Sequence, residues 1–206
     1  MEDLNKTNQE KAENPVDDTM GLKMSGHILI RDKESGEELV NKRNAIHYGN
    51  MANIIARAMT DKLGDYYIHF MGFGNGATSV DTAGKVIYKS PRVSESYESS
   101  GTLYSRTYQK VVSNNTTTDK IEVIPGPSYT DLKITCTLGY NEPSDADAFD
   151  TSTTNDGSYV FDELGLLSYA DDINDSVLLT HVIFHPVQKS KNREIEIVYT
   201  VRVQLN

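Results

Sequence analysis

The sequence has few of the residues that would build a disulfide-rich scaffold, a collagen-like fibre or a membrane anchor. Its 206 residues contain one cysteine, Cys136, which cannot form a disulfide within the chain. A protein with this cysteine content is expected to fold in a reducing compartment. No apolar run approaches the roughly 18 residues of a transmembrane helix, and residues 1–10 have neither the basic nor the apolar region of a secretory signal. These absences predict a globular protein folded in the cytoplasm, with enough chain for one domain.

Lysine and arginine are absent from one long stretch of the chain. Between Ile134 and Gln188 there is no lysine or arginine, although the chain has 20 of them and a net charge of −10. The same stretch contains ten acidic residues, Glu142, Asp145, Asp147, Asp150, Asp156, Asp162, Glu163, Asp171, Asp172 and Asp175. Such an acidic block repels nucleic acid phosphates, so we expect no direct contact with DNA or RNA. We predict that the block faces solvent or a basic partner, with a cation site as the alternative.

Residues 1–24 lack the periodicity of a folded element. Their apolar residues stand singly among Asn, Gln, Lys, Glu and Asp, which predicts an extended N-terminal arm. We expect this arm to become ordered only where it docks on neighbouring chains. Residues 25–206 have the pattern of a single β-rich structural domain, which includes an acidic loop region at 141–175. The domain opens with a predicted hairpin, in which residues 27–31 and 37–41 flank a turn at Gly36.

One segment has the pattern of an amphipathic helix. From Asn44 to about Lys62, five apolar residues recur at helical spacing, Met51, Ile54, Ile55, Ala58 and Met59. This spacing predicts a single buried stripe. Asn44 is the expected N-terminal cap, and Gly64 is expected to close the C-terminal end.

The remaining elements are predicted strands. Apolar and polar residues alternate, or aromatic and β-branched residues gather, over residues 66–73, 103–108, 131–140, 177–185 and 195–205. The last two are separated by residues 188–192, which are short enough for a hairpin. Residues 77–101, 113–119 and 141–158 are predicted to be long loops. The fold class is therefore mainly β with one α-helix, an antiparallel β-sandwich-like domain with long loops and an N-terminal extended arm.

Patterns that would indicate catalysis or metal binding fail on spacing. His181 and His185 lie on a predicted strand, where four residues separate two imidazoles by roughly 13 Å, too far to share one ion. The run from Asp145 to Asp150 begins like a calcium loop but has Phe149 where the fifth-position ligand belongs. The sequence therefore predicts no catalytic residue, no cofactor and no metal ligand. An irregular Ca²⁺ site or a hydrolytic site around Asp145–Asp156 stays open as an alternative.

Two further motifs are interpreted as structural. The run Gly72-Phe73-Gly74-Asn75-Gly76 has its third glycine one position too early for a dinucleotide fingerprint, and no helix pattern follows it. It predicts a glycine-dependent turn at the end of a strand. Cys136 lies within an alternating strand, where a small buried residue is expected rather than a nucleophile.

Three stretches together resemble small structural proteins of tailed bacteriophages, in the neck, collar and tail-fibre class. The stretches are a helix opening at Asn44 with the later run Met71–Gly76, the run Val160-Phe161-Asp162-Glu163-Leu164-Gly165-Leu166, and residues 175–201 with Pro186-Val187-Gln188-Lys189. The resemblance covers residues 26 to 206, with poorly matched insertions at 77–101 and 141–158. It implies a β-rich virion component without an active site, present in many copies and assembled in the cytoplasm of the bacterial host.

The resemblance also implies the partners. These are other virion proteins and further copies of the same chain, held together through arms and sheet edges, with no direct nucleic acid contact and no membrane. The position in the particle stays open among neck, collar, baseplate, fibre attachment and capsid decoration. The alternative is a receptor- or glycan-binding fibre or decoration module, which the twelve tyrosines and the acidic loop favour. The absence of tryptophan, the usual stacking ring for sugars, opposes it.

Overall fold

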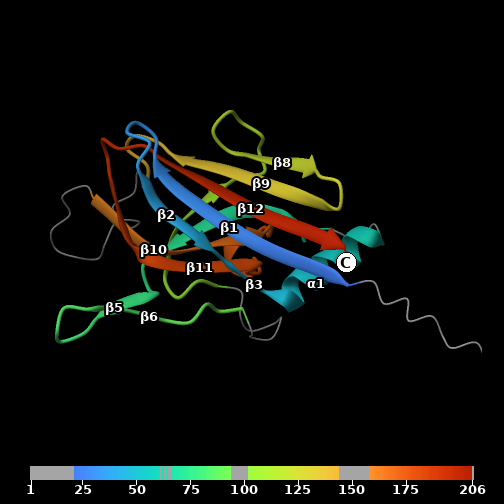
Figure 1. The fold of residues 1–206 in the computed structure, drawn as a ribbon, viewed down its shortest axis with the longest axis horizontal. Coiled ribbons are helices and arrows are strands. Elements are labelled where there is room, and N and C mark those ends of the chain that lie inside the picture. Colours follow the sequence, from blue (N-terminus) through green and yellow to red (C-terminus); the bar gives the residue numbers. More distant parts are fainter. Residues whose placement is uncertain are drawn as a thin grey trace, which may run out of the picture.

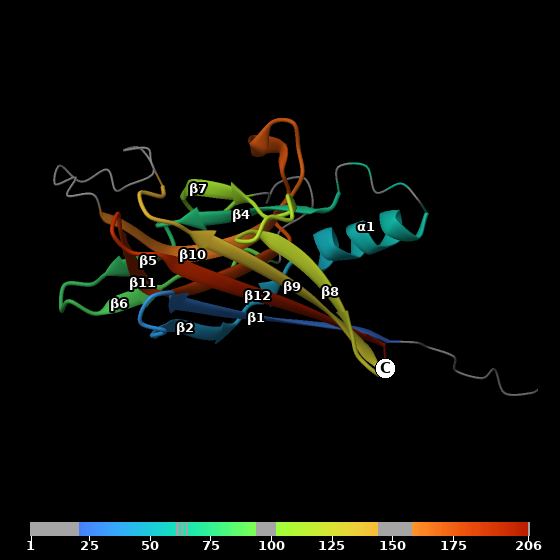
Figure 2. The same cartoon turned by 90° about the horizontal axis from the view of Figure 1, so that it is seen from above.

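Two five-stranded antiparallel sheets pack face to face in the computed structural model, and one helix lies at their end (Figures 1 and 2). The structure describes residues 21–60, 62, 64, 66–93, 102–143 and 158–205. The predicted fold class, a mainly β sandwich with one helix, is confirmed. Residues 1–20, to which most of the predicted arm belongs, lie outside the described residues.

Each sheet combines strands that are distant in the sequence. Sheet I has the strand order β2 (Glu38–Arg43), β1 (Leu22–Asp32), β12 (Ile195–Leu205), β9 (Tyr129–Leu138) and β8 (Lys120–Pro125). Sheet II has the order β3 (Ala45–Ile46), β11 (Thr180–Ser190), β10 (Ser158–Ser168), β4 (Ile68–Gly74) and β7 (Arg106–Val111). A separate hairpin is formed by β5 (Thr78–Val80) and β6 (Val86–Tyr88), and a short 3₁₀ turn spans Ile173–Asp175. The two layers therefore depend on contacts between distant parts of the chain.

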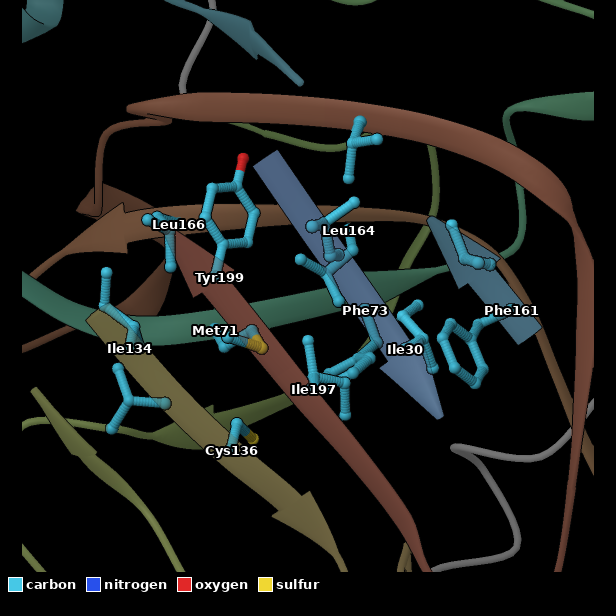
Figure 3. Close-up of a cluster of buried hydrophobic side chains, with 14 of the residues drawn as sticks. Ile30, Met71, Phe73, Ile134, Cys136, Phe161, Leu164, Leu166, Ile197 and Tyr199 are labelled. Atoms are coloured by element: carbon cyan, nitrogen blue, oxygen red, sulfur yellow. The ribbon is translucent and has the colours of Figure 1, made fainter. Parts of the chain in front are cut away.

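The core lies between the facing surfaces of the two sheets. Figure 3 shows side chains of sheet I, among them Ile30, Ile197 and Tyr199, meeting Met71 and Phe73 of sheet II. All five are fully buried. Removing an aliphatic or aromatic side chain of this size from water contributes about 1.5–3 kcal/mol each. Cys136 is also fully buried in this layer, as the alternating pattern predicts.

The N-terminal hairpin of β1 and β2 forms as predicted, with Gly36 at positive φ in the turn. However, β1 begins at Leu22, so three residues that the sequence assigns to the arm belong to the strand. Leu22 pairs with Leu205 of β12, and Met24 pairs with Val203. This extension is stabilised by a partner strand at the other end of the chain, which local periodicity cannot reveal.

The predicted hairpin between the last two strands is wrong. β11 pairs with β10 and β3 in sheet II, whereas β12 pairs with β1 and β9 in sheet I. The chain thus crosses from one layer to the other between Ser190 and Ile195. At this crossing the Arg193 guanidinium bonds Asp32, and the pKa of that carboxyl is held well below its usual range by a backbone hydrogen bond from Ser35 and by Arg193. A short connection fits a layer change as well as a hairpin.

The helix α1 (Tyr48–Met59) is shorter than predicted and buries less of its stripe. His47, not Asn44, is the N-terminal cap, because its Nδ1 accepts a hydrogen bond from the backbone N–H of Asn50. Met51 is buried and Ile54 and Ile55 are partly buried against the core, but Ala58 and Met59 are exposed, Met59 by 82%. The helix ends at Met59, and Thr60 rather than Gly64 is its C-terminal cap. None of the helices in the described part of the chain is long and apolar enough to cross a membrane.

Two stretches predicted as loops contain strands, and another strand lies in a segment for which the sequence predicts no element. The hairpin β5–β6 lies within residues 77–101, and β10 forms the middle of sheet II inside the predicted acidic loop region. β8 follows the loop at 113–119 and forms an edge of sheet I. Ser, Thr and Asp are frequent here, and these residues make side-chain to backbone bonds that hide the strand pattern.

Candidate functional surfaces

A buried carboxylate–imidazole pair, Glu163 and His181, holds several segments against the outer face of sheet II. The β10–β11 register shifts between Phe161 and Glu163, which marks a β-bulge. Phe161 and Leu164 consequently both enter the core, and Asp162 and Glu163 can bond the segments that cover the opposite face. Such a bulge is a local device for re-aiming side chains.

Every polar atom of the pair is used. Glu163 Oε1 accepts hydrogen bonds from the backbone N–H of Ser105 (2.8 Å) and Gly76 (3.3 Å). Its Oε2 accepts from the backbone N–H of Tyr104 and from His181 Nε2, each at 3.0 Å. His181 Nδ1 in turn accepts from the backbone N–H of Arg92 at 2.8 Å. Burial opposes ionisation of Glu163, but the His181 and backbone hydrogen bonds outweigh it and lower the pKa of the carboxyl.

Asp162 anchors the base of the β5–β6 hairpin in the same way. Its carboxylate accepts from the backbone N–H of Ala77 (3.1 Å) and Thr78 (2.8 Å) and from the Thr78 hydroxyl. The glycine run 72–76 allows these close approaches, because a Cβ on Gly74 would lie 2.5 Å from Glu163 Oε1. The predicted end of a strand at this run is confirmed, but its glycines serve packing rather than a left-handed turn. Asp162 and Glu163 therefore form a structural clamp.

The acidic block consequently does not act as one surface. Asp162 and Glu163 are buried, and Glu142 bonds Lys110 Nζ (2.8 Å) and the Tyr108 hydroxyl (2.6 Å). For these three the prediction of a face toward solvent or a basic partner is wrong, because backbone N–H groups and a lysine from other segments bind them. Asp145, Asp147, Asp150 and Asp156, and with them the alternative cation and hydrolytic sites, lie outside the described residues. Among the described residues no group of three metal-ligating side chains is arranged to hold an ion, and His181 and His185 are bound to different partners.

Lys189 is a second buried charge, near Glu142. Its Nζ donates to the backbone carbonyls of Gly139 and Ser190, each at 2.9 Å, and the residue is fully buried. Burial lowers the pKa of Lys189 to about 8, although Glu142 and Glu194 oppose the shift. Its position inside the sandwich gives it a role in stability.

The remaining acidic residues line a hollow of about 250 Å³ beside the 3₁₀ turn. Asp171, Asp172 and Asp175 meet the rings of Tyr66 and Tyr169 there. The Tyr169 hydroxyl donates to Asp171 at 2.8 Å. Exposed carboxylates and tyrosine rings thus line the same hollow.

A basic hollow of about 390 Å³ lies on the outer face of sheet I. It is lined by Lys23, His27, Arg43 and Arg202 together with Ser25 and Thr200. Arg202 bonds both oxygens of Asp131 (2.7 and 2.8 Å), which raises the pKa of the guanidinium, and His27 Nε2 donates to Asn41. Lys23 and Arg43 are exposed and form no ion pair within the described part of the chain. Sequence analysis missed this site because its residues come from three strands and only their register brings them together.

An apolar end of sheet I is also exposed. Figures 1 and 2 show the start of β1, the end of β12 and the β8–β9 turn together at this end. The side chains of Leu22, Val123, Ile124 and Leu205 are exposed by 46, 65, 45 and 56%. Leu22 and Leu205 are paired neighbours, whereas Val123 and Ile124 lie on the β8 edge and point to opposite faces of the sheet. Exposed apolar residues at the end and edge of a sheet suit contact with another chain.

The chain matches no protein family, no curated protein and no solved structure.

Proposed function

We propose that the chain is a non-enzymatic structural component of a tailed-bacteriophage particle, located at the neck, collar or tail. It would link neighbouring virion proteins and copies of itself through its arm and sheet edges. The observation that carries this proposal is the exposed apolar surface of sheet I, with Val123 and Ile124 on the β8 edge, which no described strand pairs, and Leu22 and Leu205 at the adjoining ends of β1 and β12. The sequence resemblance supports it independently.

The buried polar groups support the same function. Backbone groups of other segments donate hydrogen bonds to Asp162, Glu163 and His181. These bonds fix loops on sheet II. A clamp of this kind gives a rigid unit, which suits a protein that is built into an assembly. Edge strands with free N–H and C=O groups are ready templates for pairing with another chain.

The test is the presence and position of the chain in particles. Particles released by the bacterial host that carries this coding sequence are purified by density gradient, and peptides of the chain are quantified against the other particle proteins. We expect a fixed stoichiometry, and labelling with an antibody raised against the chain at the head–tail junction or tail. Recovery of the chain only from the soluble lysate, and not from particles, would contradict the proposal.

The second candidate is a receptor- or glycan-binding module, which the hollow of Tyr66, Tyr169 and three aspartates favours. Tyrosine rings can pack against sugar faces and carboxylates can accept hydrogen bonds from sugar hydroxyls. Oligosaccharides released from the host surface polysaccharide serve as the probe in calorimetry. Asp172→Ala should abolish binding if this candidate holds, while Glu122→Ala on the outer face of sheet I serves as the matched control.

A further inference from the structure

The edge of β1 is open over its first residues. β2 pairs with β1 from His27 to Arg31, and the backbone N–H of Asn44 then donates to Gly26 O at 3.1 Å. After Asn44 the chain leaves sheet I for β3 of sheet II. Residues 22–25 keep β12 on one side, but no described strand pairs with them on the other. By the alternation of an antiparallel strand, Leu22 and Met24 direct their backbone groups to this open side, as Gly26 does.

Two hollows flank the open edge, one on each face of the sheet. The outer one is the basic hollow of Lys23, His27, Arg43 and Arg202. The inner one has about 220 Å³ and is lined in its apolar part by Met24, Ile46, Tyr48 and Val93. Ser25, Gly26 and Arg43 border both hollows.

This arrangement fits an added strand. Successive side chains of a strand point to opposite faces of the sheet. A strand that continued the line of β2 along residues 22–26 would therefore place alternate side chains in a basic and in a mainly apolar environment. The fitting ligand is an extended segment that carries acidic residues together with single apolar residues.

The chain itself contains such a segment. Residues 1–20 carry six carboxylates and two lysines, a net charge of −4, with Leu4, Val16 and Met20 among them. The outer hollow is basic in a protein whose overall charge is −10. Twenty extended residues span up to about 66 Å, which exceeds the diameter of a domain of this size.

We propose that the open edge of β1 binds residues 1–20 of a second copy of this chain as an added strand. This proposal rests on the proposed function, because it assumes that copies of the chain associate with one another. It identifies the surface through which they do so. Pairing with the chain's own segment would require a reversal at Met20 and Gly21, directly before Leu22. The tight hairpin turns that suit sheet twist place their first central residue at positive φ, which is unfavourable for Met20.

Photo-crosslinking in the full-length chain tests the contact. A photoreactive phenylalanine analogue replaces Ser25, and equal amounts of ¹⁵N-labelled and unlabelled protein are mixed before irradiation and peptide mass spectrometry. We expect crosslinks from position 25 to peptides of residues 1–20 that join the two isotope forms. Crosslinks confined to one isotope form, or none to residues 1–20, would overturn the proposal.

A charge exchange supplies an independent readout. The double variant K23E/R43E reverses the groove at two exposed positions, and E2K/D3K/D17K/D18K turns the arm from −4 to +4. Each variant alone should lose the mixed crosslink about tenfold or more, because like charges then meet across the contact. A mixture of the two variants should restore it, since the reversed groove meets the reversed arm.

Controls separate this inference from the proposed function. K120E/K133E changes two other lysines on the strands of sheet I and should leave the crosslink unchanged. A basic hollow could also bind nucleic acid, and titration with a short DNA duplex tests this. If K23E/R43E removed DNA binding but left the crosslink pattern unchanged, the proposal would be overturned. Loss of the arm contact in a chain that is still found in particles would refute this inference and leave the proposed function standing.

Discussion

Three segments of the chain converge on Glu163. Its two oxygens accept four hydrogen bonds, from Gly76, Tyr104, Ser105 and His181. We expect Glu163→Gln to destabilise the protein by about 3 kcal/mol, because the amide NH₂ would face donors that have lost their acceptor. Urea unfolding followed by circular dichroism measures this cost. The exposed Asp172→Asn is the matched control and should change stability by less than about 0.5 kcal/mol.

Lys189 gives a pH dependence with a definite sign. Its pKa is about 8 in the folded protein against an ordinary value of 10.5, so between these values the unfolded chain holds the extra proton. The free energy of unfolding of the wild type should therefore rise relative to that of Lys189→Met, by about 2 kcal/mol from pH 7.5 to 10. Tyr159 and Tyr199, whose pKa values burial raises, titrate in both proteins and cancel in the difference. Parallel stability curves for the two proteins would contradict this expectation.

At the scale of elements, the helix shows how far a local pattern reaches. Its apolar spacing predicts one stripe, but only the N-terminal part packs on the sandwich: Met51 is buried and Met59 is exposed. Met51→Ala should cost about 2–4 kcal/mol, since it leaves a cavity in the core. Met59→Ala should change stability by less than about 0.5 kcal/mol. Thermal and urea denaturation of the two variants decide the point, and equal effects would mean that the helix packs along its whole length.

Strands with regular alternation were predictable, and their partners were not. Period 2 marks β9 and β12 correctly, because each buries one face against sheet II. The same pattern does not indicate which layer a strand joins. For this reason the predicted hairpin of β11 and β12 is wrong. The sequence places β10 in a loop region because the bulge at Asp162 breaks the alternation of apolar and polar residues and because acidic residues are typical of loops.

The candidate surfaces were the least predictable part of the protein. The basic hollow combines Lys23, Arg43 and Arg202 from three strands, and each residue alone is an ordinary exposed cation in the sequence. The acidic block, in contrast, is conspicuous in sequence but is divided in space. Glu163 is bound by backbone N–H groups, whose positions follow from the fold and from no sequence motif. A contact that depends on register or on backbone donors requires the structure.

At the scale of the whole molecule, the basic hollow and the hollow of three aspartates lie on different sheets. Sheet I carries the basic hollow and the exposed apolar end, while Asp171, Asp172 and Asp175 line a hollow beside sheet II. Copies that met through sheet I would therefore keep these acidic groups apart and avoid their mutual repulsion. This separation makes sheet I the expected face for self-contacts.

The apolar end of sheet I should act in assembly without contributing to folding. Val123 and Leu205 are more than half exposed, so V123E/L205E should change the free energy of unfolding by less than about 0.5 kcal/mol. The same substitutions place charges on surface that an associated copy would bury, and an unpaired buried charge strongly opposes association. Sedimentation velocity over a concentration series should show weaker self-association than the wild type. Ile87→Glu, on the exposed β5–β6 hairpin, is the control and should behave as wild type. An unchanged sedimentation profile for V123E/L205E would place the self-contact elsewhere on the molecule.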